Sequence, residues 1–232
     1  MLSFLGIGAQ KAGTTWLYEQ MRLHPEVAFP LGKEAHFWTN PHSVTDQARY
    51  LEAFDLCSVK AGEITPAYAL LDTDPIRRIH EIAPELRIVY ILRDPIARAW
   101  SSALMALSRA EMSIDEASDQ WFIDHFHSKG SRARGDYQTT LARWRAEFPP
   151  DALLVLAYSQ IAADPQALLS SVALHLGLAP DPFLALPEEN LRQRVFAGQA
   201  VPIRESLVPT LERLYRAQMD ALCAYLGNPN PW

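Results

Sequence analysis

The chain has 232 residues, of which 49% are hydrophobic and 21% are charged, and this composition excludes a disordered chain, a collagen and a coiled coil. Its 21 Lys and Arg residues and 27 Asp and Glu residues give a formal net charge of -6, which argues against broad binding to nucleic acid or to an anionic membrane. Cys57 and Cys223 stand apart without metal-ligand spacing, so they predict neither a zinc site nor a disulfide framework, and they fit a reducing compartment.

The N-terminal apolar stretch is short and runs directly into a glycine loop. It therefore predicts a first strand and not a signal peptide. No apolar run reaches the roughly 18 residues that a membrane span requires. We expect a cytoplasmic protein with a single domain over residues 1–232, because no segment reads as a linker.

Short apolar runs alternate with longer amphipathic stretches along the chain. This alternation predicts an α/β fold in which a central parallel sheet is flanked by helices on both faces. The expected strands lack polar alternation, as strands covered on both faces do. They are residues 3–8, 59–63, 87–92 and 153–157.

Asp-Pro pairs mark the expected helix starts, because Asp can cap the first turn and Pro is tolerated at the first helical position. These pairs begin at Asp74, Asp94 and Asp164. The third helix should end at Gly177, and a last helix should cover about residues 205–226. Two less regular stretches, residues 30–46 and 111–135, predict substrate loops or lids.

The segment Gly8-Ala-Gln-Lys-Ala-Gly-Thr-Thr15 follows the first expected strand and opens a helix. Glycines allow a tight turn, and backbone N–H groups at a helix N-terminus attract an anion, so the segment predicts phosphate binding. It differs from a Walker A loop, because Thr14 stands where that motif has its lysine and Lys11 precedes the second glycine. The alternative is a plain strand-to-helix turn with a surface lysine.

A second strand–turn–helix places Arg93 at the end of the third expected strand and Ser101 eight residues later. Ligands of open α/β sheets bind at the carboxyl ends of strands, and a guanidinium suits a terminal phosphate. Arg98 lies between them, either as a further ligand or as a solvated helix residue.

Both motifs resemble those of sulfotransferases that use 3′-phosphoadenosine-5′-phosphosulfate (PAPS). The resemblance implies a P-loop-type three-layer fold and a donor site made by the two motifs. By this resemblance Lys11 touches the oxygen that bridges phosphate and sulfate, and Arg93 and Ser101 hold the 3′-phosphate. It also implies that Trp16 stacks on adenine, although Trp16 can equally be a core aromatic. The residues implied to hold the 5′-phosphosulfate are Lys11, Ala12, Gly13, Thr14 and Thr15.

The segment Lys33-Glu-Ala-His-Phe-Trp38 resembles the K-E-x-x-F-[FW] element of heparan-sulfate-type and related bacterial sulfotransferases. This resemblance implies that Glu34 is the general base and that Lys33 stabilises charge near the sulfate. His36 is the rival base, and a solvated Lys33–Glu34 charge pair is the plain alternative. Residues 62–68 resemble the family's E-K-[ST]-P-x-Y-F element, but Ile64 replaces its lysine, which weakens the expectation of a heparan-like substrate.

Near the end of the chain, Arg194 and Gly198 lie where relatives have a basic loop that closes on the nucleotide. The predicted reaction transfers a sulfuryl group from PAPS to a hydroxyl or amine, leaves adenosine 3′,5′-bisphosphate (PAP) and requires no metal. The acceptor is expected to be a small or carrier-bound molecule, and the sequence specifies neither its identity nor the oligomeric state. The alternatives are a P-loop nucleotide kinase and a non-catalytic nucleotide-binding protein.

Overall fold

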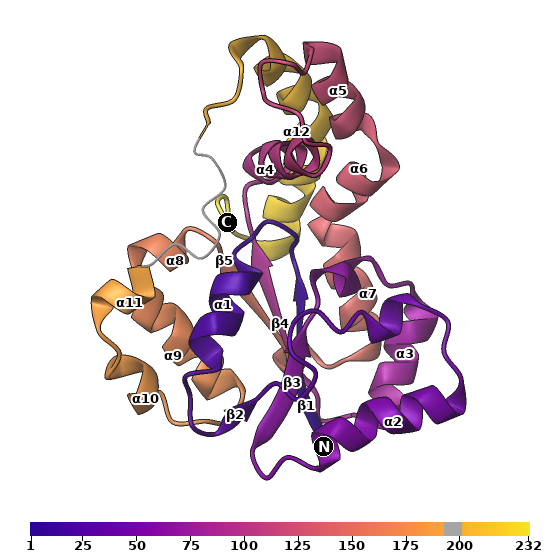
Figure 1. Ribbon diagram of the computed structural model, residues 1–232, viewed down its shortest axis with the longest axis vertical. Helices are drawn as coiled ribbons and strands as arrows, with labels where there is room; N and C mark the ends of the chain where they lie inside the picture. The colour runs from indigo at the N-terminus through magenta and orange to yellow at the C-terminus, as the bar shows by residue number, and fades with distance from the viewer. Residues whose placement is uncertain (193–200) are drawn as a thin grey trace.

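The computed structural model describes residues 1–192 and 201–232, and its centre is a five-stranded parallel sheet (Figure 1). The strand order is β2-β3-β1-β4-β5, and β1 pairs with both β3 and β4 in parallel. The interior strands are apolar because helices cover both of their faces. The strands are β1 (Leu2–Gly8), β2 (Val27–Ala28), β3 (Lys60–Ile64), β4 (Arg87–Leu92) and β5 (Leu153–Ala157).

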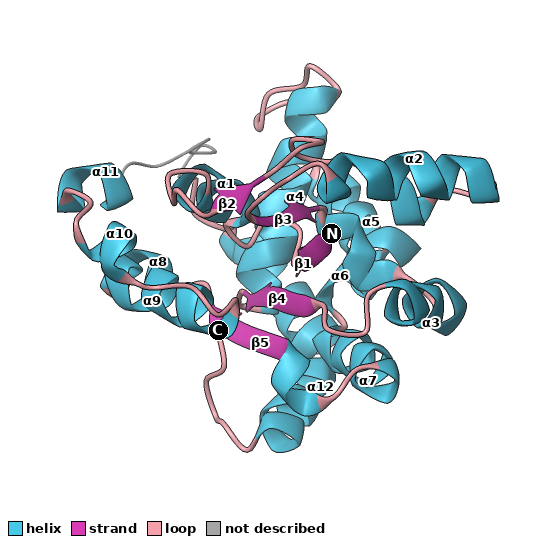
Figure 2. Cartoon of the chain, turned by 90° about the horizontal axis from the view of Figure 1, so that it is seen from below, coloured by secondary structure: helices cyan, strands magenta, loops and turns pink. Residues whose placement is uncertain are grey.

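Helices lie on both sides of this sheet, which makes three layers (Figure 2). On one side are α1 (Thr14–Met21), α8 (Gln160–Ala163), α9 (Pro165–His175), α10 (Asp181–Leu184) and α11 (Glu188–Arg192). On the other side are α2 (Val44–Asp55), α3 (Thr73–Ile82) and α7 (Tyr137–Glu147). The main hydrophobic core fills the space between these layers.

A second group of helices stands above the carboxyl ends of the strands (Figure 1). It contains α4 (Pro95–Arg109), α5 (Asp119–His127), α6 (Lys129–Gly135) and the long α12 (Val208–Leu226). Helices α4, α5 and α12 share their own buried cluster, which includes Trp100, Phe122 and Tyr215. The group therefore places a wall of helices beside the carboxyl edge of the sheet, where the predicted ligand motifs begin.

The four predicted strands are confirmed within one residue at each end, and the two-residue β2 was not predicted. Asp94 and Asp164 cap α4 and α9, as expected, by accepting hydrogen bonds from Ala97 and Ala167. The expected start at Asp74 is wrong, because α3 begins at Thr73 and Asp72 occupies its N-cap.

The expectation of an irregular stretch over residues 111–135 is wrong for most of its length, since it contains α5 and α6. Ser118 and Ser128 cap the two helices through their side chains, and Phe122 and Phe126 bury one face of α5. Residues 30–46 are largely irregular, apart from a short 3-10 helix at Phe37–Thr39 and the start of α2. The single domain over residues 1–232 stays a prediction. Within residues 1–192 and 201–232, every helix is too short or too polar to span a membrane.

Candidate functional site

The loop between β1 and α1 ends in a backbone conformation that favours glycine. Gly13 occupies the N-cap of α1 in the left-handed region with φ 80°, and a Cβ there would lie 2.3 Å from Cδ1 of Ile161. No side chain caps α1. The N–H groups of its first turn therefore face the loop, and no capping side chain accepts a hydrogen bond from them. A helix N-terminus of this kind binds an anion, which agrees with the predicted phosphate loop.

Lys11 and Arg93, predicted from separate motifs, come together at the carboxyl edge of the neighbouring strands β1 and β4. Nη1 of Arg93 donates to the Lys11 carbonyl oxygen over 2.7 Å, and the Arg93 guanidinium lies 4.6 Å from the ring centroid of Tyr158. Burial, then the charges of Arg93 and Arg109, lower the pKa of Lys11. Three cations therefore share one small region, which favours an anionic ligand there.

Ser101 and Arg98 lie on α4, beyond its Asp94 cap. Ser101 is partly exposed, as a ligand-binding residue must be. Arg98 is fully buried, so the expectation of a solvated helix residue is wrong. Its Nη2 donates to the Ser131 carbonyl over 2.8 Å and contacts the Tyr215 hydroxyl at 3.4 Å, which ties α4 to α6 and α12.

Trp16 is 5% exposed and belongs to the main core. Its Nε1 donates to the Leu191 carbonyl over 2.8 Å, which joins α1 to α11. Stacking of Trp16 on adenine stays a prediction. Arg194 and Gly198 lie outside the described residues.

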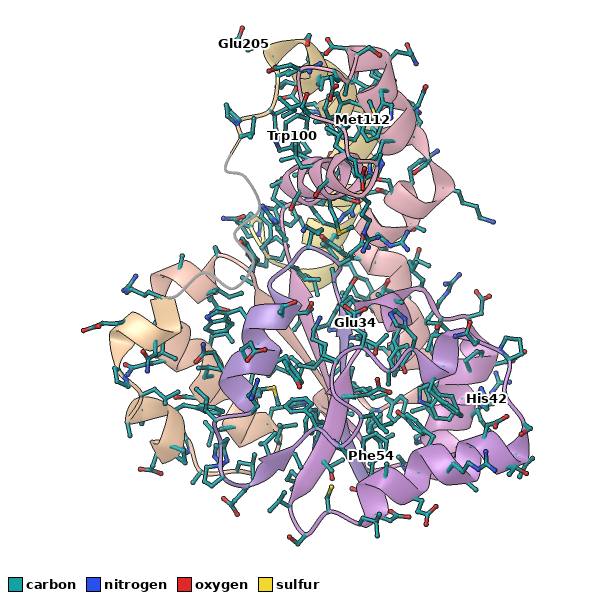
Figure 3. The ribbon with its side chains drawn as sticks, viewed as in Figure 1. Glu34, His42, Phe54, Trp100, Met112 and Glu205 are labelled. Atoms are coloured by element: carbon teal, nitrogen blue, oxygen red, sulfur yellow. The ribbon has the colours of Figure 1, made fainter. Side chains whose placement is uncertain are left out.

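In the segment Lys33–His36, the Glu34 carboxylate lies between two basic side chains, those of Lys33 and His36. Oε1 of Glu34 lies 3.0 Å from Nζ of Lys33, and its Oε2 lies 3.0 Å from Nε2 of His36. The Lys33 side chain is 9% exposed and the Glu34 side chain 32%. Glu34 lies near the middle of the molecule, by the carboxyl end of the sheet (Figure 3). A partly exposed carboxylate with basic neighbours can accept a proton from a bound hydroxyl.

A buried carboxylate beneath this segment was not predicted as a site residue. Glu63 on β3 is fully buried and accepts hydrogen bonds from three hydroxyl groups. These come from Tyr50, from Tyr68 over 2.7 Å and from Thr65 over 2.8 Å. Burial, followed by the Glu63 carboxylate, raises the pKa of both tyrosines, which keeps them protonated as donors.

The same three hydroxyl oxygens accept hydrogen bonds from the segment that carries Glu34. The His36 backbone N–H donates to Thr65 over 3.4 Å. The Trp38 backbone N–H donates to Tyr68 over 3.4 Å, and its indole N–H donates to Tyr50 over 3.2 Å. Because every hydroxyl proton points to one carboxylate, every hydroxyl can accept from this segment. The sequence signals for this network are an acidic residue inside an apolar strand and the resemblance of residues 62–68 to the family's E-K-[ST]-P-x-Y-F element.

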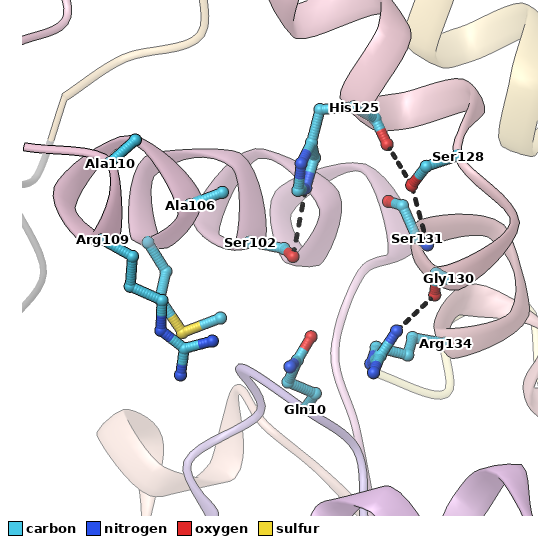
Figure 4. A pocket seen from close by; sticks show the side chains of 11 residues that line it. Gln10, Ser102, Ala106, Arg109, Ala110, His125, Ser128, Gly130, Ser131 and Arg134 are labelled. Carbon is cyan, nitrogen blue, oxygen red and sulfur yellow. Dashed lines mark hydrogen bonds between the residues drawn. The ribbon is translucent and has the colours of Figure 1, made fainter. Parts of the chain in front are cut away.

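A cavity of about 440 Å³ opens beside the glycine loop, between Gln10 and helices α4, α5 and α6 (Figure 4). His125 Nε2 lies 3.2 Å from the Ser102 hydroxyl on its wall. Within residues 1–192 and 201–232, no group of three or more His, Cys, Asp or Glu side chains is placed to hold a metal ion.

Residues 70–182 match the model of a family described as the sulfotransferase family. Among curated proteins, the chain is 30% identical over 179 residues to heparan sulfate glucosamine 3-O-sulfotransferase 6 of Mus musculus, a match that covers 74% of this chain and 51% of that protein. It is 28% identical over 177 residues to carbohydrate sulfotransferase 15 of Rattus norvegicus, covering 56% of this chain and 30% of that one. The chain thus spans about half the length, or less, of these relatives.

Solved structures share the fold. A sulfotransferase from Alicyclobacillus acidocaldarius superposes with a TM-score of 0.75 at 21% identity, covering 98% of this chain and 96% of that one. Mouse sulfotransferase SULT7A1, complexed with PAP, superposes with a TM-score of 0.61 at 14% identity, covering 94% and 84% of the two chains. The predicted P-loop-type α/β fold and the predicted resemblance are confirmed.

Proposed function

Since this chain belongs to the sulfotransferase family, we propose that it transfers a sulfuryl group from PAPS to a hydroxyl or amine acceptor. The observation that carries the proposal is the joint placement of Lys11 and Arg93 beside the uncapped N-terminus of α1. This arrangement supplies two cations and free backbone donors where the phosphate groups of the donor would bind. The similar fold of SULT7A1, which was solved with PAP, supports the choice of donor.

The two motifs divide the donor between them. The loop from Lys11 to Thr15 would hold the 5′-phosphosulfate through backbone N–H groups and the threonine hydroxyls. Arg93 and Ser101 would hold the 3′-phosphate, and Trp16 would contact the adenine. The contact of Arg93 with the Lys11 carbonyl couples the two halves of this site, so donor binding at one motif supports the geometry of the other.

Glu34 would act as the general base of an in-line displacement. The acceptor oxygen or nitrogen forms a bond to sulfur as the bond from sulfur to the bridging phosphate oxygen breaks, and the acceptor proton passes to Glu34. Lys11 would stabilise the negative charge that develops on the leaving oxygen. PAP and the sulfated acceptor are the products.

His36 remains the rival base, because its Nε2 lies within hydrogen-bond distance, 3.0 Å, of Oε2 of Glu34. In that arrangement Glu34 would orient the imidazole and His36 would take the proton. Glu34→Gln and His36→Asn separate the two roles. The base is the residue whose replacement abolishes the rise of kcat with pH while PAP affinity is kept.

Ile64 replaces the lysine that the heparan-type relatives are expected to carry, so we propose an acceptor other than a heparan-like chain. A kinase is the less favoured function, because the loop lacks a lysine at the Walker position. A cytoplasmic location also stays a proposal, in keeping with the free thiols of Cys57 and Cys223.

The experiment is transfer of ³⁵S from labelled PAPS to a panel of hydroxyl and amine acceptors, in buffer with a metal chelator. We expect labelled product with the unaltered chain and at least a hundredfold loss of rate in Lys11→Ala. Binding of ATP with magnesium in preference to PAP would identify a kinase instead. Binding of PAP without transfer to any acceptor would identify a non-catalytic nucleotide-binding protein.

A further inference from the structure

We propose that the cavity between Gln10 and helices α4, α5 and α6 binds the acceptor through an anionic group that the acceptor carries, held by Arg134 and Arg109. This rests on the proposed function, because the cavity is taken as the acceptor site of the transfer. A volume of about 440 Å³ matches a small molecule with a phosphate or carboxylate. The reacting hydroxyl or amine would lie at the end of the cavity near the glycine loop.

The cavity is positively charged although the whole chain carries a net charge of -6. Two arginines and a histidine line it, and no Asp or Glu is among the described residues on its wall (Figure 4). The remaining wall offers hydroxyl groups and a short apolar surface. The hydroxyl groups are those of Ser102, Ser128 and Ser131, and the apolar surface includes Met105.

Behind this wall lies the fully buried Arg98, which adds a third positive charge. Its hydrogen bonds run to neutral partners, namely Ser131 and Tyr215, and its Nε and Nη1 find no hydrogen-bond partner among the described residues. A buried guanidinium without a carboxylate is costly. After burial itself, the Arg98 charge lowers the pKa of Arg134 and of His125, so its field reaches the cavity wall.

A bound anion would offset this concentration of positive charge. Nη1 of Arg134 donates to the Gly130 carbonyl over 2.9 Å, which fixes the guanidinium at the cavity and leaves its remaining N–H groups to bind a ligand. Charge-assisted bonds to a phosphate or carboxylate are about twice as strong as neutral ones. The geometry therefore selects an acceptor with such a group over its neutral counterpart.

The cavity adjoins the place where the sulfuryl group would be transferred. Gln10, on its wall, precedes Lys11 in the glycine loop. Arg109, on the opposite wall, is close enough to contribute to the lowered pKa of Lys11. On α4, Ser101 belongs to the proposed donor site and its neighbour Ser102 to the cavity wall. Consecutive residues of α4 thus belong to the two proposed binding sites.

The test uses phenyl phosphate and phenol as a matched anionic and neutral pair, added to protein saturated with PAP. The NMR signal of the His125 ring, assigned with a His125→Asn variant, reports binding in the cavity. We expect saturable binding of phenyl phosphate and at least tenfold weaker binding of phenol. Arg134→Gln should weaken phenyl phosphate at least tenfold, and Arg109→Gln should weaken it in the same direction.

Arg132→Gln is the matched control, because Arg132 lies on the same helix α6 but is exposed and outside the cavity wall. It should leave phenyl phosphate binding unchanged. Equal binding of phenol and phenyl phosphate, equal effects of Arg132→Gln and Arg134→Gln, or absence of saturation would each overturn the proposal. Displacement of phenyl phosphate by added PAP, in a titration begun without PAP, would overturn it as well. Failure of PAP to bind would refute the proposed function instead, and the titration without PAP would still report on the cavity.

Discussion

The buried Glu63 network makes a quantitative prediction for Glu63→Gln. This change keeps the size of the side chain and replaces one acceptor oxygen by an NH2 group that can only donate. If the amide oxygen keeps the two tyrosine hydroxyls, the NH2 group faces the Thr65 hydroxyl, which lies 2.8 Å from the present carboxylate oxygen. Thr65 must then turn its proton away from residue 63.

The cost follows from what this proton meets. The Thr65 oxygen already accepts from the His36 N–H, so its proton is left without an acceptor in a fully buried position. An unsatisfied buried donor costs about 1–3 kcal/mol, and the two tyrosine hydrogen bonds lose their charge assistance. The neutral amide avoids the desolvation of a carboxylate, which offsets part of this. We therefore expect a loss of about 2 kcal/mol in the free energy of unfolding.

Urea unfolding followed by circular dichroism measures this loss. Glu52→Gln on α2 is the control, because Glu52 is exposed and its replacement should change stability by less than about 0.5 kcal/mol. Hydrogen exchange of a peptide covering residues 33–40 adds a local readout. The amide of His36 should exchange faster in Glu63→Gln, since its acceptor, the Thr65 hydroxyl, has turned.

Equal stability of Glu63→Gln and the unaltered chain, or unchanged exchange in residues 33–40, would show that Glu63 does not orient these hydroxyls. Thr65→Val removes only one of the three hydroxyls and should fall between the two. A Thr65→Val variant less stable than Glu63→Gln would also contradict the reasoning.

Three further predictions concern the loop, the base and the half-buried His175. Gly13→Ala should destabilise the fold and weaken PAP binding in calorimetry, because φ is 80° there and the new Cβ would lie 2.3 Å from Cδ1 of Ile161, which must move. Gly177→Ala is the control, since φ is 71° but the space around it is open. It should show only the backbone cost of about 1 kcal/mol. Glu34→Gln should keep PAP affinity and lose transfer of ³⁵S; full activity would remove Glu34 from the base role. Burial lowers the pKa of His175 below 6.5, so the unfolded chain binds more protons and stability falls as the pH drops below about 6.5; urea unfolding at several pH values should show a shallower fall in His175→Gln.

The parallel sheet was predictable because its strands are apolar runs with turn signals after them. The two-residue β2 carries no such run, and only its pairing with β3 defines it. The helices α5 and α6 were missed because the His, Gly, Ser and Arg residues around them suggested a loop. Their serine caps and the buried spacing of Phe122 and Phe126 outweigh that composition.

The tight turn between β1 and α1 was predictable from spacing, since Gly8 and Gly13 mark positions where the backbone takes a positive φ. Contacts between distant segments were not. The hydrogen bond from Arg93 to the Lys11 carbonyl spans 82 positions, and Arg98 is buried by helices that follow it in the chain. The cavity has the same origin, because Gln10, Arg109 and Arg134 come from three separate elements.

The most direct test of the two-ended donor site compares PAP with AMP by calorimetry, in the presence of a chelator. We predict that PAP binds at least tenfold more tightly than AMP, because a 3′-phosphate gains charge-assisted bonds to Arg93 and Ser101. Ser101→Ala should reduce PAP affinity and leave AMP affinity unchanged, whereas Lys11→Ala should reduce both. Equal affinities of PAP and AMP for the unaltered chain, or equal effects of Ser101→Ala on both nucleotides, would contradict a 3′-phosphate site at the start of α4.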